Sequence, residues 1–117
     1  MIVQEICTAF EDFAPLALQE SYDNAGLQVG KRSDTINGIL LCIDITEDVI
    51  DEAIRHSCNL IISHHPLIFK GLKRLTGDDY VQRCVIKAIQ NNIAIYSAHT
   101  NLDSVAEGVN GRIAQKI

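Results

Sequence analysis

Hydrophobic positions along the chain alternate between short continuous apolar runs and helical spacing. The apolar runs are rich in β-branched residues and predict short strands, which occupy residues 27–29, 39–45, 60–63 and 93–97. Helical spacing predicts amphipathic helices around these runs, and they occupy residues 2–13, 47–54, 81–89 and a stretch from about residue 105 onward. Thr46 is a candidate N-cap, since Glu47 and Asp48 place negative charge in the first turn that follows it.

The order of these segments predicts how the chain folds. Strand, helix, strand, helix and strand follow one another from residue 39 to residue 97, which indicates two right-handed βαβ crossovers. We therefore expect an α/β protein with a parallel or mixed sheet and flanking helices. With 117 residues, 47% of them hydrophobic, residues 1–117 are expected to form a single domain with a substantial core.

Charge and composition narrow the function. A formal net charge of −5 argues against a surface that binds nucleic acid directly through phosphate neutralisation. The sequence has neither a secretory leader nor an apolar stretch long enough to span a bilayer, so we expect a cytoplasmic protein without membrane contact. The four cysteines are widely spaced, which favours small buried side chains over thiolate ligands or a redox pair.

Two adjacent histidines, His64 and His65, follow the strand at 60–63 and precede Pro66. Proline suits a strand end and favours extended backbone at His65, where neighbouring side chains point opposite ways. Such a pair would serve two metal ions, one each, better than it would clamp one. The alternative is that one or both imidazoles are hydrogen-bonded core or loop groups.

More polar residues follow the other parallel strands, namely Asp44 after the first and His99 and Asp103 after the third. In parallel sheets, sites form at the carboxyl ends of the strands, and neighbouring strands lie only about 4.8 Å apart. We expect Asp103 to bind metal rather than to cap a helix, because Ser104 provides a better cap. His99 has three alternatives, as a ligand, a proton carrier or a partner of a backbone carbonyl, and Asp44 is expected to support a ligand or to form a turn.

Other polar residues are more ambiguous. Asn24 and Gln28 lie among turn-forming glycines, and turn chemistry is favoured over a position facing a site. Lys70, Lys73 and Arg74 form a basic cluster after the histidines. This cluster either attracts a small anionic or phosphorylated substrate or is a solvated loop.

Four stretches together resemble the Nif3-like dinuclear-metal family, often labelled GTP cyclohydrolase type-2 homologues. They are NAGLQVG (24–30), CIDIT (42–46), SHHPLIFKGLKRLTG (63–77) and IAIYSAHTNLDSVAEGVN (93–110). The resemblance covers nearly the whole chain but corresponds to the N-terminal half of the family's proteins. It implies that His64, His65 and Asp103 bind two divalent ions, such as zinc, iron or manganese, with a histidine and a glutamate from a C-terminal segment.

The resemblance also implies a function and an assembly. It implies a metal-dependent hydrolase that acts on a nucleotide or another small anion, and a toroidal homohexamer. In such a hydrolase we expect His99 to be the catalytic proton carrier. An alternative is a metal-containing binding or regulatory module that interacts with partner proteins. A third reading is an inactive part of a longer protein, whose exposed apolar surface promotes self-association.

Overall fold

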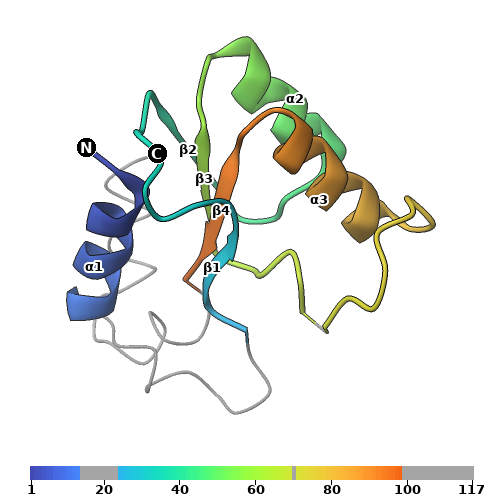
Figure 1. Cartoon of the computed structure of the whole chain (residues 1–117), viewed down its shortest axis with the longest axis horizontal. Helices are drawn as coiled ribbons and strands as arrows, with labels where there is room; N and C mark the ends of the chain where they lie inside the picture. Colours follow the sequence, from blue (N-terminus) through green and yellow to red (C-terminus); the bar gives the residue numbers. More distant parts are fainter. Residues whose placement is uncertain (14–23, 70, 99–117) are drawn as a thin grey trace.

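The computed structural model describes residues 1–13, 24–69 and 71–98 of the chain. Three helices and four strands form in this part (Figure 1). The helices are α1 (Val3–Phe13), α2 (Glu47–Arg55) and α3 (Tyr80–Gln90), and the strands are β1 (Gly26–Val29), β2 (Ile39–Cys42), β3 (Leu60–Ser63) and β4 (Ala94–Ser97). No helix in the described ranges is long and apolar enough to cross a membrane. The helix expected from about residue 105 lies outside these ranges.

The four strands form one mixed sheet in the order β1-β4-β3-β2. The pairs β2–β3 and β3–β4 are parallel, and β1 pairs antiparallel with β4. The predicted α/β class, with helices joining parallel strands, is therefore confirmed. The carboxyl ends of the three parallel strands meet at one edge of the sheet, where Cys42, Ser63 and Ser97 are paired in register.

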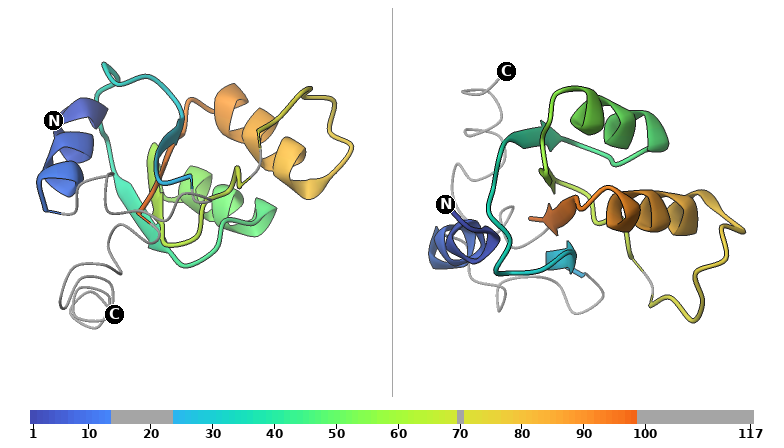
Figure 2. Two further views of the ribbon diagram at one scale, coloured as in Figure 1. Left: turned by 90° about the horizontal axis from the view of Figure 1, so that it is seen from below. Right: turned by 45° about the horizontal axis from the view of Figure 1, so that its top comes forward.

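Both faces of the sheet are covered by helices. Figures 1 and 2 show α1 on one side and α2 and α3 on the other. Alternate residues of β3 enter the two cores, with Ile61 packing in the α2–α3 core and Leu60 and Ile62 in the α1 core. All four residues of β3 are buried, as expected for a strand covered on both faces.

The strand predicted at 39–45 ends earlier than expected. β2 stops at Cys42, and residues 43–44 form a bend, so Asp44 lies beyond the strand rather than within it. Thr46 then caps α2 as predicted, because its side-chain oxygen accepts a hydrogen bond of 3.2 Å from the backbone N–H of Val49. The early bend turns the chain away from the sheet towards this cap.

The four cysteines are free thiols. Cys7 and Cys84 are fully buried and Cys42 and Cys58 are half-buried, in line with the predicted packing role. Burial raises the pKa of the Cys84 thiol to about 11, with a further contribution from the Glu47 carboxylate. Such a thiol stays protonated at neutral pH, which makes it a poor nucleophile and a poor metal ligand.

Candidate metal-binding edge of the sheet

His64 and His65 lie just past β3, where their backbone is hydrogen-bonded to the end of β2 and to the residue that follows it. The backbone N–H of His64 donates to the carbonyl of Cys42 at 3.1 Å, and that of His65 donates to the carbonyl of Ile43 at 2.9 Å. The parallel pairing of β2 and β3 is thus continued by two hydrogen bonds beyond the strands. The histidines are therefore placed by the sheet itself, even though they lie in a bend.

The two imidazole rings lie side by side. Their centroids are 4.8 Å apart, and the ring planes are inclined by 39°. We expected the side chains to point opposite ways, and this was wrong because both residues lie in a bend after β3 rather than in extended strand. The bend brings both rings to the same region of the carboxyl edge.

Asp44 reaches the histidine pair from the loop that follows β2. Its Oδ1 lies 2.6 Å from Nδ1 of His65, which is hydrogen-bond distance, and both side chains are substantially exposed. A carboxylate only accepts, so the protonated nitrogen of a neutral His65 is Nδ1. In that tautomer Nε2 carries the lone pair, and it is this atom that binds the ion in the carboxylate–histidine arrangement common at metal sites. The expectation that Asp44 supports a ligand fits this geometry.

Two buried serines hold the backbone of the histidines, and sequence reasoning missed both. The Ser63 hydroxyl donates to the carbonyl of His65 at 2.8 Å, and the Ser97 hydroxyl donates to that of His64 at 3.4 Å. Ser63 is 1% exposed and Ser97 is fully buried. The available signal is their position, since each is the polar last residue of an otherwise apolar strand.

Asn24 and Gln28 hold the loop that follows the histidines. Nδ2 of Asn24 donates to the carbonyl of Ile68 at 2.7 Å, and Oε1 of Gln28 accepts from the N–H of the same residue at 2.8 Å. Gln28 also donates to the carbonyl of Asn24. The expectation of purely local turn chemistry was incomplete, because these amides satisfy the backbone of a segment forty residues away.

Several predicted site residues lie outside the described ranges, namely His99, Asp103 and Lys70. Within the described part of the chain, no group of three or more His, Cys, Asp or Glu side chains is arranged to hold a metal ion. His64 and His65 are thus the two candidate ligands that the described residues bring together. Imidazole suits zinc, iron and related ions, but two ligands form an incomplete site.

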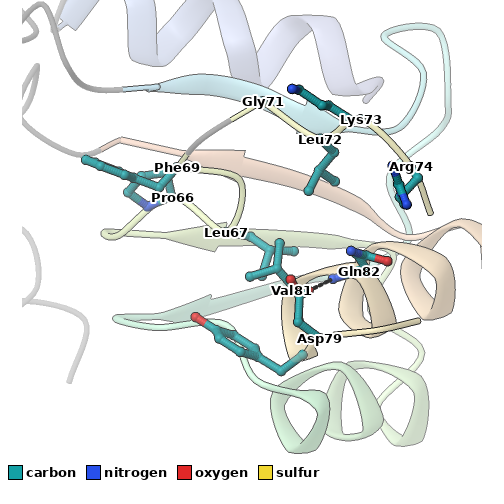
Figure 3. A pocket seen from close by; sticks show the side chains of 11 residues that line it. Pro66, Leu67, Phe69, Gly71, Leu72, Lys73, Arg74, Asp79, Val81 and Gln82 are labelled. Carbon is teal, nitrogen blue, oxygen red and sulfur yellow. Dashed lines mark hydrogen bonds between the residues drawn. The ribbon is translucent and has the colours of Figure 1, made fainter. Parts of the chain in front are cut away.

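The remaining members of the basic cluster, Lys73 and Arg74, line a pocket of about 510 Å³. The pocket lies between the loop after the histidines and the first turn of α3 (Figure 3). Pro66, the residue directly after His65, belongs to its lining. Neither histidine lines the pocket, so the basic residues are connected to the histidine pair through Pro66 and the loop that follows it.

A mixed sheet with two imidazoles at the carboxyl edge of its parallel strands defines an α/β protein with a candidate metal-binding edge. The model of the family described as Duf34/NIF3 (NGG1p interacting factor 3) matches residues 1–117. The chain belongs to this family, as the sequence resemblance predicted.

Known relatives are similar along almost the whole of this chain. A Clostridium acetobutylicum protein named "GTP cyclohydrolase 1 type 2 homolog" is 50% identical over 111 residues, which are 95% of this chain and 41% of the relative. Human "NIF3-like protein 1" is 39% identical over 116 residues, 98% of this chain and 31% of the relative. The chain thus spans less than half the length of these curated relatives.

Solved structures support the fold independently. A Staphylococcus aureus protein with a crystal structure matches with a TM-score of 0.90 and 38% identity, over 98% of this chain and 37% of that protein. A Bacillus cereus protein described as related to NIF3 matches with a TM-score of 0.87 and 42% identity, over 98% of this chain and 32% of that protein. The arrangement of sheet and helices is therefore that of the corresponding part of NIF3-like proteins.

Proposed function

We propose that this chain supplies the histidine part of a dinuclear metal site, in which His64, His65 and Asp103 bind two divalent ions. The observation that supports this most directly is the pair of imidazole rings with centroids 4.8 Å apart at the carboxyl edge of the sheet. Ions in two-metal hydrolytic sites lie about 3.5–4 Å apart. Rings at this spacing suit one ligand for each ion, and zinc, iron and manganese all accept imidazole.

The ligand set is completed, in this proposal, by residues beyond those described. Asp103 supplies a carboxylate, and a histidine and a glutamate come from a later segment of a full-length protein. The length of the relatives leaves room for such a segment, since the chain spans 41% of the Clostridium acetobutylicum protein. Assembly into a hexamer in the cytoplasm is part of the same proposal.

The proposed reaction is hydrolysis of a small anionic substrate such as a nucleotide. The name of the Clostridium acetobutylicum relative, a GTP cyclohydrolase 1 type 2 homolog, points to ring opening of a purine nucleotide. Bound ions would supply Lewis acidity that activates a water molecule at neutral pH. Asp44 fixes the ring of His65 through the 2.6 Å contact, and His99 carries a proton to or from the substrate.

A second candidate function is a metal-containing binding module without catalysis. The family description names an interacting factor, which favours contacts with a partner protein. In that case the ions stabilise the fold or a docking surface. Turnover separates the two candidates, because only the hydrolase converts a nucleotide or phosphoester when a full-length, metal-loaded relative is assayed.

The test of the metal site is elemental analysis of the purified chain after zinc loading, with the intact mass determined on the same sample. We expect near-stoichiometric metal in the wild type and its loss in His65→Ala. His56→Ala is the matched control, because His56 is exposed at the end of α2, away from the carboxyl edge. This control should retain the wild-type metal content.

Two results would count against the proposal. Equal metal content in His65→Ala and the wild type would show that zinc binds elsewhere. The second result has two parts: the folded wild-type chain holds no metal, and a full-length relative keeps its metal after the equivalent histidine is replaced. Together they would show that the histidines are not metal ligands. Circular dichroism of each variant checks that the fold is retained.

A further inference from the structure

The pocket lined by Lys73 and Arg74 also contains the side-chain amide of Gln82, of which only the oxygen forms hydrogen bonds within the described residues. Gln82, in the first turn of α3, is only 9% exposed and lines this pocket. Its Oε1 accepts hydrogen bonds from the Thr76 backbone N–H at 3.0 Å, the Thr76 hydroxyl at 3.2 Å and the Asp78 backbone N–H at 3.2 Å. Since backbone N–H groups can only donate, the oxygen of the amide must face the loop.

The amide nitrogen of Gln82 consequently faces the other way. Among the described residues, Nε2 of Gln82 has no hydrogen-bond acceptor, although the side chain is nine-tenths buried. Nε2 is not among the fully buried polar atoms of the described residues, so it keeps contact with the solvent in the pocket, and a ligand there can accept a hydrogen bond from it. The hydrogen bonds of Oε1 thus fix Nε2 of Gln82 as a hydrogen-bond donor for a ligand in the pocket.

The charges around the pocket favour an anion as that acceptor. Lys73 and Arg74 contribute two positive charges, and within the described ranges neither has an ion-pair partner. Asp79 is the opposing carboxylate, but its Oδ1 accepts the backbone N–H of Gln82 at 2.9 Å as the cap of α3. The start of an eleven-residue helix adds partial positive charge in the same place.

The rest of the lining is apolar and partly aromatic. Leu67 is buried, whereas Phe69 is 48% exposed and Tyr80 is 54% exposed. Figure 3 shows Leu67 and Phe69 on the loop after the histidines, and Tyr80 is the first residue of α3. Such a lining suits a ligand with an apolar or planar part as well as a charge.

We propose that this pocket binds a small organic phosphate. Lys73, Arg74 and Nε2 of Gln82 hold the phosphate group, and Leu67 and Phe69 contact the apolar part. Its role as the substrate of the histidine edge rests on the proposed function, but binding itself requires no metal. Pro66 lines the pocket and directly follows His65, so the loop that leaves the candidate metal site forms one wall of the pocket.

The test is calorimetric titration of the 117-residue chain with phenylphosphonate, whose C–P bond resists hydrolysis, in the presence of EDTA. The key variant is Gln82→Glu, because a carboxylate keeps an acceptor for Thr76 and Asp78 but replaces the donor with a negative charge. We expect affinity to fall about tenfold or more. Gln90→Glu, at the exposed end of the same helix, carries the same charge change and should bind as the wild type does.

Two further measurements test the contribution of Arg74 and of the apolar part of the ligand. Arg74→Met leaves the hydrogen bonds of Gln82 intact and should also weaken binding about tenfold. Methylphosphonate, which lacks the ring, should bind more weakly than phenylphosphonate. The proposal is overturned if phenylphosphonate does not bind the folded chain, or if Gln82→Glu and Gln90→Glu bind it equally well.

The experiments distinguish a failure of the proposed metal site from a failure of the proposed phosphate pocket. Loss of phenylphosphonate binding with metal retained at the histidines would overturn only the pocket. The reverse outcome is that phenylphosphonate binds in EDTA while neither the chain nor a full-length relative holds metal at the histidines. In that case the protein binds phosphate but lacks the proposed hydrolase site.

Discussion

Asp44 is the residue through which the loop after β2 acts on the candidate metal site. It touches His65 at Nδ1, the nitrogen that does not face a ligand in the proposed arrangement. Carboxylates in this position orient the imidazole and increase its basicity as a metal ligand. Asp44 is exposed, so its removal should affect the site far more than the fold.

We therefore expect Asp44→Asn to weaken zinc binding about 10- to 100-fold with little change in the free energy of unfolding. The measurement is competition with a chromophoric chelator, with urea unfolding of the apoprotein alongside. Asp34→Asn removes the same charge from the loop at the opposite edge of the sheet and should bind zinc as the wild type does. Equal zinc affinities in Asp44→Asn and Asp34→Asn would show that Asp44 does not support a metal ligand.

Gln82 and the serines show why single residues were the hardest feature to predict. The polar type of Gln82 within a helix gives no sign that its oxygen satisfies Thr76 and Asp78 in the preceding loop. Ser63 and Ser97 likewise act on histidine carbonyls that only the fold brings near. Adjacent histidines, by contrast, are visible in the sequence because their chemistry is concentrated in one short motif.

At the scale of elements, periodicity predicted the strands and helices well and their ends less well. β3 matches its predicted range of 60–63, since an apolar run buried on both faces leaves no ambiguity. β2 was predicted three residues too long, because Ile43 and Ile45 continue the apolar pattern while the bend at 43–44 ends the pairing. The N-cap at Thr46 was predictable from side-chain chemistry alone.

The junction between β1 and β4 depends on Gly30, which lies directly after β1. Gly30 has φ +111°, and a Cβ added there would lie 2.6 Å from the Cβ of Ala94. Both the backbone conformation and the close approach require glycine. This junction places β1, and with it the Asn24 and Gln28 side chains that hold the loop after the histidines.

Gly30→Ala should destabilise the chain by about 2–4 kcal/mol, as overpacking adds to backbone strain. Two controls separate these causes in urea unfolding followed by circular dichroism. Gly77→Ala has positive φ but no contact closer than 3.8 Å, and should cost about 1 kcal/mol. Gly71→Ala has open space and should stay within about 0.5 kcal/mol of the wild type. Equal costs at positions 30 and 77 would mean that Ala94 gives way.

At the scale of the whole molecule, Tyr96 joins the first helix to the last described strand. Its ring is fully buried, with its centroid 5.4 Å from that of Phe10, and its hydroxyl donates to Oε2 of Glu11 at 3.3 Å. Burial, and then the Glu11 carboxylate, raise the pKa of the Tyr96 hydroxyl above its usual value of 10.0. The folded state therefore favours the protonated phenol.

Because the pKa of Tyr96 is raised on folding, its contribution to stability is complete below about pH 10 and is lost as pH rises beyond that value. Tyr96→Phe should cost about 0.5–1.5 kcal/mol at pH 7, where it removes only the hydrogen bond to Glu11. The difference should shrink as pH rises from 10 to 11, because phenylalanine does not ionise. Urea unfolding at each pH measures this convergence, with Tyr80→Phe as the control at an exposed tyrosine. If the difference in the free energy of unfolding between Tyr96→Phe and the wild type stays constant from pH 10 to 11, folding does not raise the pKa of Tyr96.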